Sequence, residues 1–232
     1  MAVVKNQYLL ICIVLSIVIL LGVTYHHRSV PTFIPDSFPS TTVILDAGHG
    51  GVDGGATSAD GIIESDVNLA VTKRLALLMI FCGQRVALTR IDTGDLAAPE
   101  AHSIRDKKVS DLKNRVAAIN SISNAMLISI HQNSLAGQSK VRGAQVFYNT
   151  VPDANRAANQ VQQFLNDTIN IQNAKNPKAI DKSIYLMNQV LCPAILVECG
   201  FLSNPHEAHQ LCTPEYQKQL VLAIAAGYLQ YK

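Results

Sequence analysis

Tryptophan is absent from this 232-residue chain, aromatic residues make up 6% of it, and charged residues make up only 16%. With 48% apolar residues and so little charge, the chain is not a disordered polyelectrolyte. Removing Lys5 and Arg28 from the totals leaves 17 basic and 17 acidic residues from residue 31 onward. A neutral domain with few aromatic rings lacks the basic surface and stacking platforms that bind nucleic acid. We therefore expect no nucleic-acid partner.

C-x-x-C spacing and internal repeats are also missing. The five cysteines are Cys12, Cys82, Cys192, Cys199 and Cys212. Their scatter excludes a structural zinc site made of thiolates. For the four that follow the N-terminal region we predict buried free thiols, with a disulfide as the alternative. The absence of a repeat excludes an appended binding module built from repeats.

One long apolar run stands near the N-terminus, between Lys5 and Arg28. The eighteen residues from Tyr8 to Tyr25 carry no charge, and as a helix they would span about 27 Å, close to the hydrocarbon thickness of a bilayer. The length of the run and the lack of an A-x-A site favour a transmembrane anchor within residues 1–25 over a cleaved signal peptide. The anchor places the rest of the chain outside the cytoplasm, bound to the membrane; cleavage would instead release a secreted protein.

Residues 26–40 hold three prolines and no periodic pattern, so we interpret them as a stalk. The remaining residues, 41–232, form one predicted domain. Strands are predicted at 42–48, 85–90, 126–132, 143–149 and 195–200, and helices at 63–82, 110–120, 153–171 and 214–231. This alternation predicts a single α/β domain with a central, largely parallel twisted sheet flanked by helices. Residues 91–109 are expected to form a long loop, a common form of lid.

Four chemically distinctive side chains fall at strand ends or at a helix start. His49 lies in a glycine-rich turn, Glu64 opens a helix, and His131 and Glu198 end strands. Because the carboxyl ends of parallel strands meet at one edge of the sheet, these groups are expected to converge there. A phosphate cradle is disfavoured, since Asp53 stands where a dinucleotide fingerprint needs glycine. Three ligands of the His/Glu/His type with one water make an open zinc site, and the remaining carboxylate can act as a base.

These residues lie in four segments, DAGHGG (46–51), Glu64, SIHQN (129–133) and VECGFLSN (197–204). The segments resemble, in order, the four signatures of zinc-dependent N-acetylmuramoyl-L-alanine amidases, and the resemblance covers residues 42–231. It implies that His49, Glu64 and His131 bind one Zn²⁺ and that Glu198 is the catalytic carboxylate. It also implies that the substrate is peptidoglycan, cleaved between N-acetylmuramic acid and L-alanine of the stem peptide. Ala47 and Gln132 depart from the family's usual residues, and neither change removes a ligand.

Within this family, the chain is similar to the germination-specific amidases of spore-forming bacteria. The N-terminal anchor, the absence of repeats and the segments 95–100 and 111–116 carry that similarity, which implies a role in spore cortex maturation. Two alternatives remain. A zinc carboxypeptidase that trims stem peptides would need an arginine for the terminal carboxylate, and no motif marks one. A non-catalytic, membrane-anchored peptidoglycan-binding domain would not need the intact ligand set. The sequence does not identify a protein activator.

Several other polar residues have simpler explanations. We predict surface positions for His102, His206 and His209, structural pairing for Arg115 and Asn120, core packing for Cys199 and substrate contact or ligand orientation for Asn133. The basic cluster of Arg105, Lys107 and Lys108 is expected in a solvated loop, with contact to a stem-peptide carboxylate as the alternative.

Overall fold

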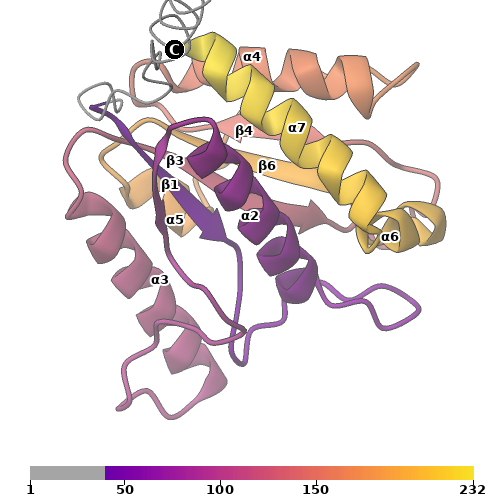
Figure 1. The fold of residues 1–232 in the computed structure, drawn as a ribbon. Helices are drawn as coiled ribbons and strands as arrows, with labels where there is room; N and C mark the ends of the chain where they lie inside the picture. Colours follow the sequence, from indigo (N-terminus) through magenta and orange to yellow (C-terminus); the bar gives the residue numbers. More distant parts are fainter. Residues whose placement is uncertain (1–39) are drawn as a thin grey trace, which may run out of the picture. The chain divides into compact units, whose positions relative to one another are not determined.

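The computed structural model describes residues 40–232 (Figure 1). The strands are β1 (Thr42–Ala47), β2 (Arg85–Leu88), β3 (Ala125–Asn133), β4 (Gln145–Tyr148), β5 (Lys178–Ala179) and β6 (Ala194–Phe201). The helices are α2 (Glu64–Phe81), α3 (Ile104–Asn120), α4 (Ala154–Thr168), α5 (Tyr185–Gln189), α6 (Pro205–Leu211) and α7 (Pro214–Tyr231).

All six strands belong to one sheet, in the order β2-β1-β3-β6-β4-β5. The four strands β2, β1, β3 and β6 are mutually parallel, and β4 pairs with β6 in the antiparallel sense. The expected α/β domain with a largely parallel sheet is confirmed. The carboxyl ends of β1, β3 and β6 therefore meet at one edge of the sheet.

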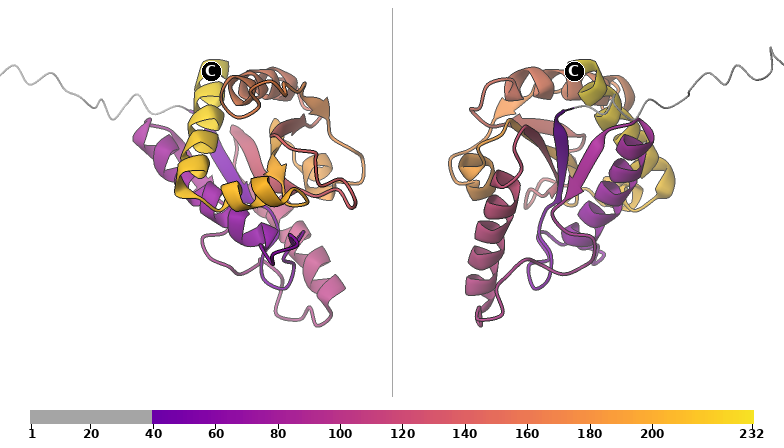
Figure 2. Two further views of the ribbon diagram at one scale, coloured as in Figure 1. Left: turned by 90° about the vertical axis from the view of Figure 1, so that its right-hand side faces the viewer. Right: turned by 60° about the vertical axis from the view of Figure 1, so that its left-hand side comes forward.

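Helices cover both faces of the sheet. The larger core lies between the sheet and α2, α4 and α7, and includes Val43, Ile128 and Val197. The smaller core, which includes Ile44, Leu127 and Leu196, lies under α3 and α5. Figure 2 shows α2 and α3 on opposite sides of the strands. Because side chains alternate along a strand, this division fixes which residues face α3.

The expectation of a loop across residues 91–109 is wrong for its last six residues, since α3 begins at Ile104. Ser103 caps the helix by accepting a hydrogen bond from the Asp106 N–H at 3.0 Å. The basic cluster of Arg105, Lys107 and Lys108 therefore lies in the first turns of a helix. The short elements β5, α5 and α6 were not predicted from the sequence.

The prediction of buried free thiols holds only in part. The four cysteines of the described region are unpaired, but Cys82 and Cys212 are exposed and Cys192 is partly buried. Cys199 is buried in the larger core, on the face opposite Glu198, as expected for packing.

The predicted anchor (1–25) and the stalk (26–40), apart from Ser40, lie outside the described residues. Within residues 40–232, no helix is long and apolar enough to span a membrane.

Candidate metal centre and catalytic cleft

The register between β3 and β6 places two of the predicted site residues side by side. His131 and Glu198 are direct partners in this parallel ladder, so their side chains emerge next to each other on one face. It is the face covered by α3 and α5, because Leu127 and Leu196 of the smaller core share the same alternation. The pairing brings together a histidine and a carboxylate that are far apart in the sequence.

His49 follows β1 in a turn that glycine makes possible. Its own φ is 61°, in the left-handed region, where few residues other than glycine are found. The Nδ1 atom lies 2.9 Å from Asp53 Oδ2, and Nε2 lies 3.3 Å from Glu64 Oε1. A Cβ atom at Gly48 would collide with the His131 ring, so only glycine leaves room for both histidines.

Glu64 is the first residue of α2, and backbone donors hold both of its carboxylate oxygens. Oε2 accepts a hydrogen bond from the Ala56 N–H at 2.9 Å, and Oε1 accepts one from the Gln132 N–H at 3.1 Å. The Asn68 side chain also donates to Oε1 at 3.3 Å. Burial raises the pKa of Glu64, but the hydrogen bonds and charges of His131 and His49 lower it by a larger amount. The pKa of Glu64 therefore lies well below its usual value. The carboxylate is therefore charged and fixed in position.

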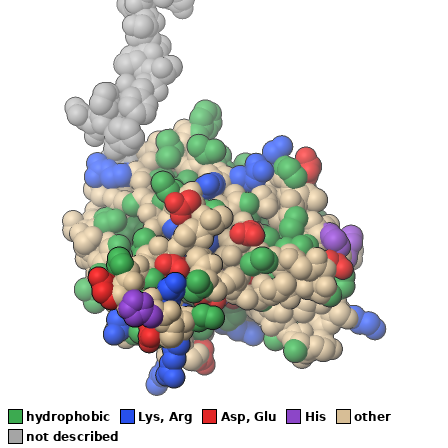
Figure 3. All heavy atoms as spheres, turned by 90° about the horizontal axis from the view of Figure 1, so that it is seen from below, with side chains coloured by type: hydrophobic (Ala, Val, Ile, Leu, Met, Phe, Trp, Pro, Cys, Tyr) green, Lys and Arg blue, Asp and Glu red, His purple; other side chains and the backbone are tan. Residues whose placement is uncertain are grey.

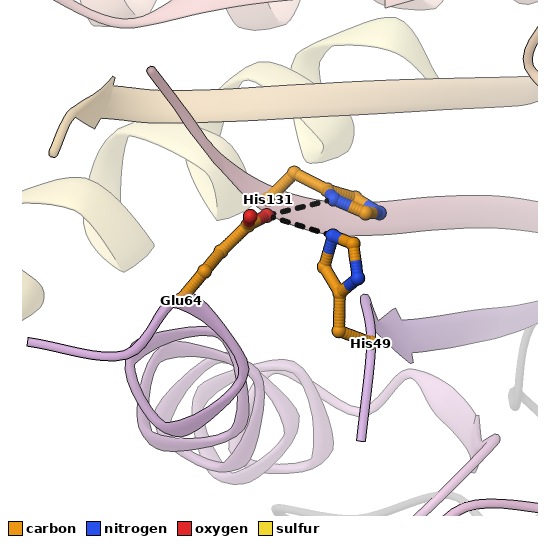
Figure 4. Close-up of side chains that lie close together, drawn as sticks. All are labelled: His49, Glu64 and His131. Carbon is orange, nitrogen blue, oxygen red and sulfur yellow. Dashed lines mark hydrogen bonds and ion pairs between the residues drawn. The ribbon is translucent and has the colours of Figure 1, made fainter. Parts of the chain in front are cut away.

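His49, Glu64 and His131 point toward one another and can each offer one donor atom to a shared cation (Figure 4). These donor atoms all lie within 4.8 Å of one another, and His131 Nδ1 is 3.0 Å from Glu64 Oε1. Burial lowers the pKa of His49, whereas hydrogen bonds to Asp53 and Glu64 raise it to about 9. Two imidazoles and one carboxylate match the donor set of catalytic zinc sites. The three residues thus fit a zinc ion, which would displace the His49 proton.

Glu198 lies beside this cluster without joining it. Its Oε2 atom is shielded from solvent and has no hydrogen-bond partner among residues 40–232. Burial raises the pKa of Glu198 to about 7, with His131 lowering it and Glu64 raising it. A carboxyl group that titrates near neutral pH, with a free oxygen, has the properties of a general base.

Two buried arginines hold the turn that carries His49. Arg115 of α3 donates to Asp46 at 2.7 Å and to the His49 carbonyl at 2.7 Å, and its Nε bonds Asp111 at 2.9 Å. Arg90 donates to the carbonyl oxygens of Ala47 and Gly48. The structural pairing predicted for Arg115 is confirmed. The role of Arg90 was missed, because one arginine at a strand end gives no sequence signal.

A cleft of about 450 Å³ opens over the cluster. The four predicted site residues line it together with Asn133, Lys108 and Tyr185. Lys108 Nζ lies 2.9 Å from Asp53 Oδ2, so part of the basic cluster reaches the site. Tyr185 belongs to α5, which the sequence did not predict.

The remaining polar residues lie where they were expected. His102, His206 and His209 are exposed, and His209 pairs with Asp60 at the surface. Asn120 bonds the backbone of Gln189 and Leu191, which is a structural role.

Comparison with known proteins identifies the family. The sequence profile described as N-acetylmuramoyl-L-alanine amidase matches residues 43–230, nearly the whole described domain. The chain belongs to the N-acetylmuramoyl-L-alanine amidase family. Hydrolysis of the amide bond between N-acetylmuramic acid and L-alanine in peptidoglycan is therefore its activity.

Individual amidases show the same relationship. The germination-specific N-acetylmuramoyl-L-alanine amidase of Bacillus subtilis is 35% identical over 219 residues, which is 93% of this chain and 90% of the relative. The CwlD amidase of Clostridioides difficile, solved in complex with the GerS lipoprotein, is 39% identical with a TM-score of 0.78, and the match covers 82% of this chain and 98% of that one. The amidase AmiC2 of Nostoc punctiforme is 29% identical with a TM-score of 0.68, over 82% and 96% of the two chains. These matches favour an amidase over the carboxypeptidase and the non-catalytic binding domain.

Proposed function

We propose that this amidase is zinc-dependent, with His49, Glu64 and His131 as ligands and Glu198 as the catalytic base. The observation that supports the ligand set is the convergence of three donors within 4.8 Å, from the turn after β1, the start of α2 and the end of β3. Asp53 bonds the outer nitrogen of His49, the carboxylate–histidine arrangement that orients ligands in zinc enzymes.

The residues of the cleft have different roles in amide hydrolysis. When bound, zinc supplies Lewis acidity that polarises a carbonyl and acidifies water. Glu198 takes the proton of the attacking water through its free oxygen and returns it to the leaving nitrogen of L-alanine. Lys108 and Asn133 line the same cleft, where they can contact the carboxylate and amide groups of a stem peptide.

The biological substrate in this proposal is spore cortex peptidoglycan, reached from the cell envelope. The similarity to the germination-specific amidase of Bacillus subtilis supports the cortex assignment. The apolar run in residues 8–25 supports an envelope location, with the catalytic domain outside the cytoplasm. Digestion of cortex and vegetative sacculi side by side tests the preference, with mass analysis of the released peptides. Equal cleavage of both substrates would contradict a cortex-specific role.

The ligand assignment predicts the metal content of variants. The wild-type protein should retain one zinc per chain after dialysis, and His49→Ala or His131→Ala should abolish tight binding, because two donors cannot hold the ion. Metal analysis by mass spectrometry measures this content. His209→Ala, which alters an exposed histidine, is the control and should keep its zinc. Stoichiometric zinc in the His49→Ala/His131→Ala double variant would contradict the assignment.

The partner of His49 should tune the affinity for zinc. We expect Asp53→Ala to weaken zinc binding by about 10–100-fold, because His49 loses the acceptor that fixes its orientation. Competition with a chelator measures the affinity. Asp60→Ala is the matched control, since Asp60 also pairs with a histidine but at the exposed surface. An affinity within twofold of the wild type for Asp53→Ala would show that Asp53 does not orient the ligand.

A further inference from the structure

Helices α2 and α7 lie side by side (Figure 1). Together they expose four large apolar side chains. Phe81 is 89% exposed, Leu77 is 71% exposed, and Leu222 and Ile80 are 58% and 57% exposed. Leu77 and Leu222 line a shallow groove of about 310 Å³ between the two helices. We call these four side chains and the groove the α2–α7 face. Large exposed apolar patches on soluble domains mark interaction sites.

The acidic residues of α2 and α7 lie in the first turn of each helix, and the charges farther along both helices are basic. Residues 67–91, which include most of α2, contain no acidic residue, and neither do residues 216–232 of α7 and the C-terminus. The exposed charges there are basic, from Lys73, Arg85, Lys218 and Lys232. The domain is neutral overall, so this face is a local excess of positive charge. By contrast, acidic and basic side chains are interspersed on the face seen in Figure 3.

Exposed apolar side chains flanked by lysine and arginine are typical of surfaces that lie on anionic membranes. We propose that the α2–α7 face rests on an anionic lipid surface, with Phe81, Ile80 and Leu77 entering the headgroup region. Lys73 and Lys218 then meet lipid phosphates. We choose a lipid surface as the occupant because basic side chains match its anionic headgroups and apolar side chains match the hydrocarbon beneath them.

The position of the face in the fold agrees with this assignment. Because α2 begins at Glu64 and rises 1.5 Å per residue, Phe81 lies about 25 Å along the helix from the metal cluster. The cleft is therefore at the opposite end of α2 from the exposed apolar residues. The C-terminal end of α2 lies near the start of β1, where the chain outside the structure joins (Figure 1).

The absence of tryptophan provides a direct test. Phe81→Trp in the full chain gives a single fluorescent reporter on the α2–α7 face, and Ile104→Trp, at a site 70% exposed on α3, gives a control away from it. Both variants are mixed with vesicles of phosphatidylglycerol and phosphatidylcholine, or of phosphatidylcholine alone. We expect a blue shift of the Phe81→Trp emission, and quenching by brominated acyl chains, only with the anionic vesicles. The Ile104→Trp emission should not change.

The charge requirement is tested on the same reporter. Lys73→Gln and Lys218→Gln should each lower the apparent affinity for anionic vesicles about fivefold. Retained amidase activity shows that each variant is folded, since all of these positions lie outside the cleft. An unchanged Phe81→Trp emission would overturn the proposal and leave a protein partner as the occupant. Equal shifts for both reporters, or a shift that is the same with neutral vesicles, would also overturn it.

Discussion

Glu198→Gln should keep its zinc and lose turnover by roughly 10²–10⁴-fold, the contribution of a general base. The substitution preserves the size of the side chain and removes its capacity to accept a proton. Zinc retention is expected because Glu198 is not among the residues whose donors converge. The measurements are zinc content and the rate of stem-peptide release from purified peptidoglycan.

Glu64→Gln is the matched control, because it makes the same chemical change at the other glutamate. A neutral amide is a poor zinc ligand, so this variant should lose affinity for the metal itself. If Glu198→Gln loses the metal and Glu64→Gln keeps it, the two roles are reversed. If both variants keep zinc and full activity, the catalytic site is elsewhere in the chain.

Arg115→Met should destabilise the folded protein by about 3–5 kcal/mol, the usual effect of removing one partner from a buried ion pair. Arg115 and Asp46 are each 1% exposed, and their atoms lie 2.7 Å apart. Without the guanidinium, Asp46 keeps its hydrogen bonds from Thr89 and Ser129 but has no compensating charge. Urea denaturation measures the free energy of unfolding.

Arg156→Met serves as the control, since Arg156 pairs with Asp153 at the surface. That pair should contribute less than about 1 kcal/mol. If Arg115→Met lost no more stability than Arg156→Met, the buried network would not stabilise the fold.

The pH dependence of Arg115→Met should differ from that of the wild type. Burial raises the pKa of Asp46, but Arg115, Ser129 and Thr89 lower it below its usual value. The wild-type carboxylate therefore adds stability that is present above an unfolded pKa of about 3.9 and is lost as the pH falls. In Arg115→Met no positive charge offsets the effect of burial, so we expect the pKa of Asp46 to rise. The stability difference between the two proteins should be large at pH 7 and shrink below pH 4.

The sequence predicted the site better than it predicted the cleft around it. His49, Glu64, His131 and Glu198 stand at strand ends or a helix start, and the parallel sheet brings such positions to one edge. The hydrogen-bond partners of Glu64 were not predictable, because backbone donors such as the Ala56 N–H carry no residue signature.

The elements that were missed give weak signals in the sequence, for two physical reasons. β5 has two residues and α5 has five, too few for a hydrophobic period to emerge. The first turns of α3 are highly charged, so the Ser103 cap was the only sign that the helix begins there. Tyr185 and Lys108 line the cleft, but the hydrophobic pattern of the sequence did not predict that their segments lie beside it.

The order of the site residues along the chain has a consequence for when the enzyme becomes active. The three proposed ligands, His49, Glu64 and His131, precede β4 in the sequence, whereas Glu198 follows it. The last helix, α7, packs against α2, which begins with Glu64. A chain that has emerged from the ribosome only as far as β4 therefore contains the three proposed ligands, but it contains neither Glu198 nor the helix that packs against α2. We therefore expect no hydrolysis by the nascent chain until Glu198 and α7 have been synthesised.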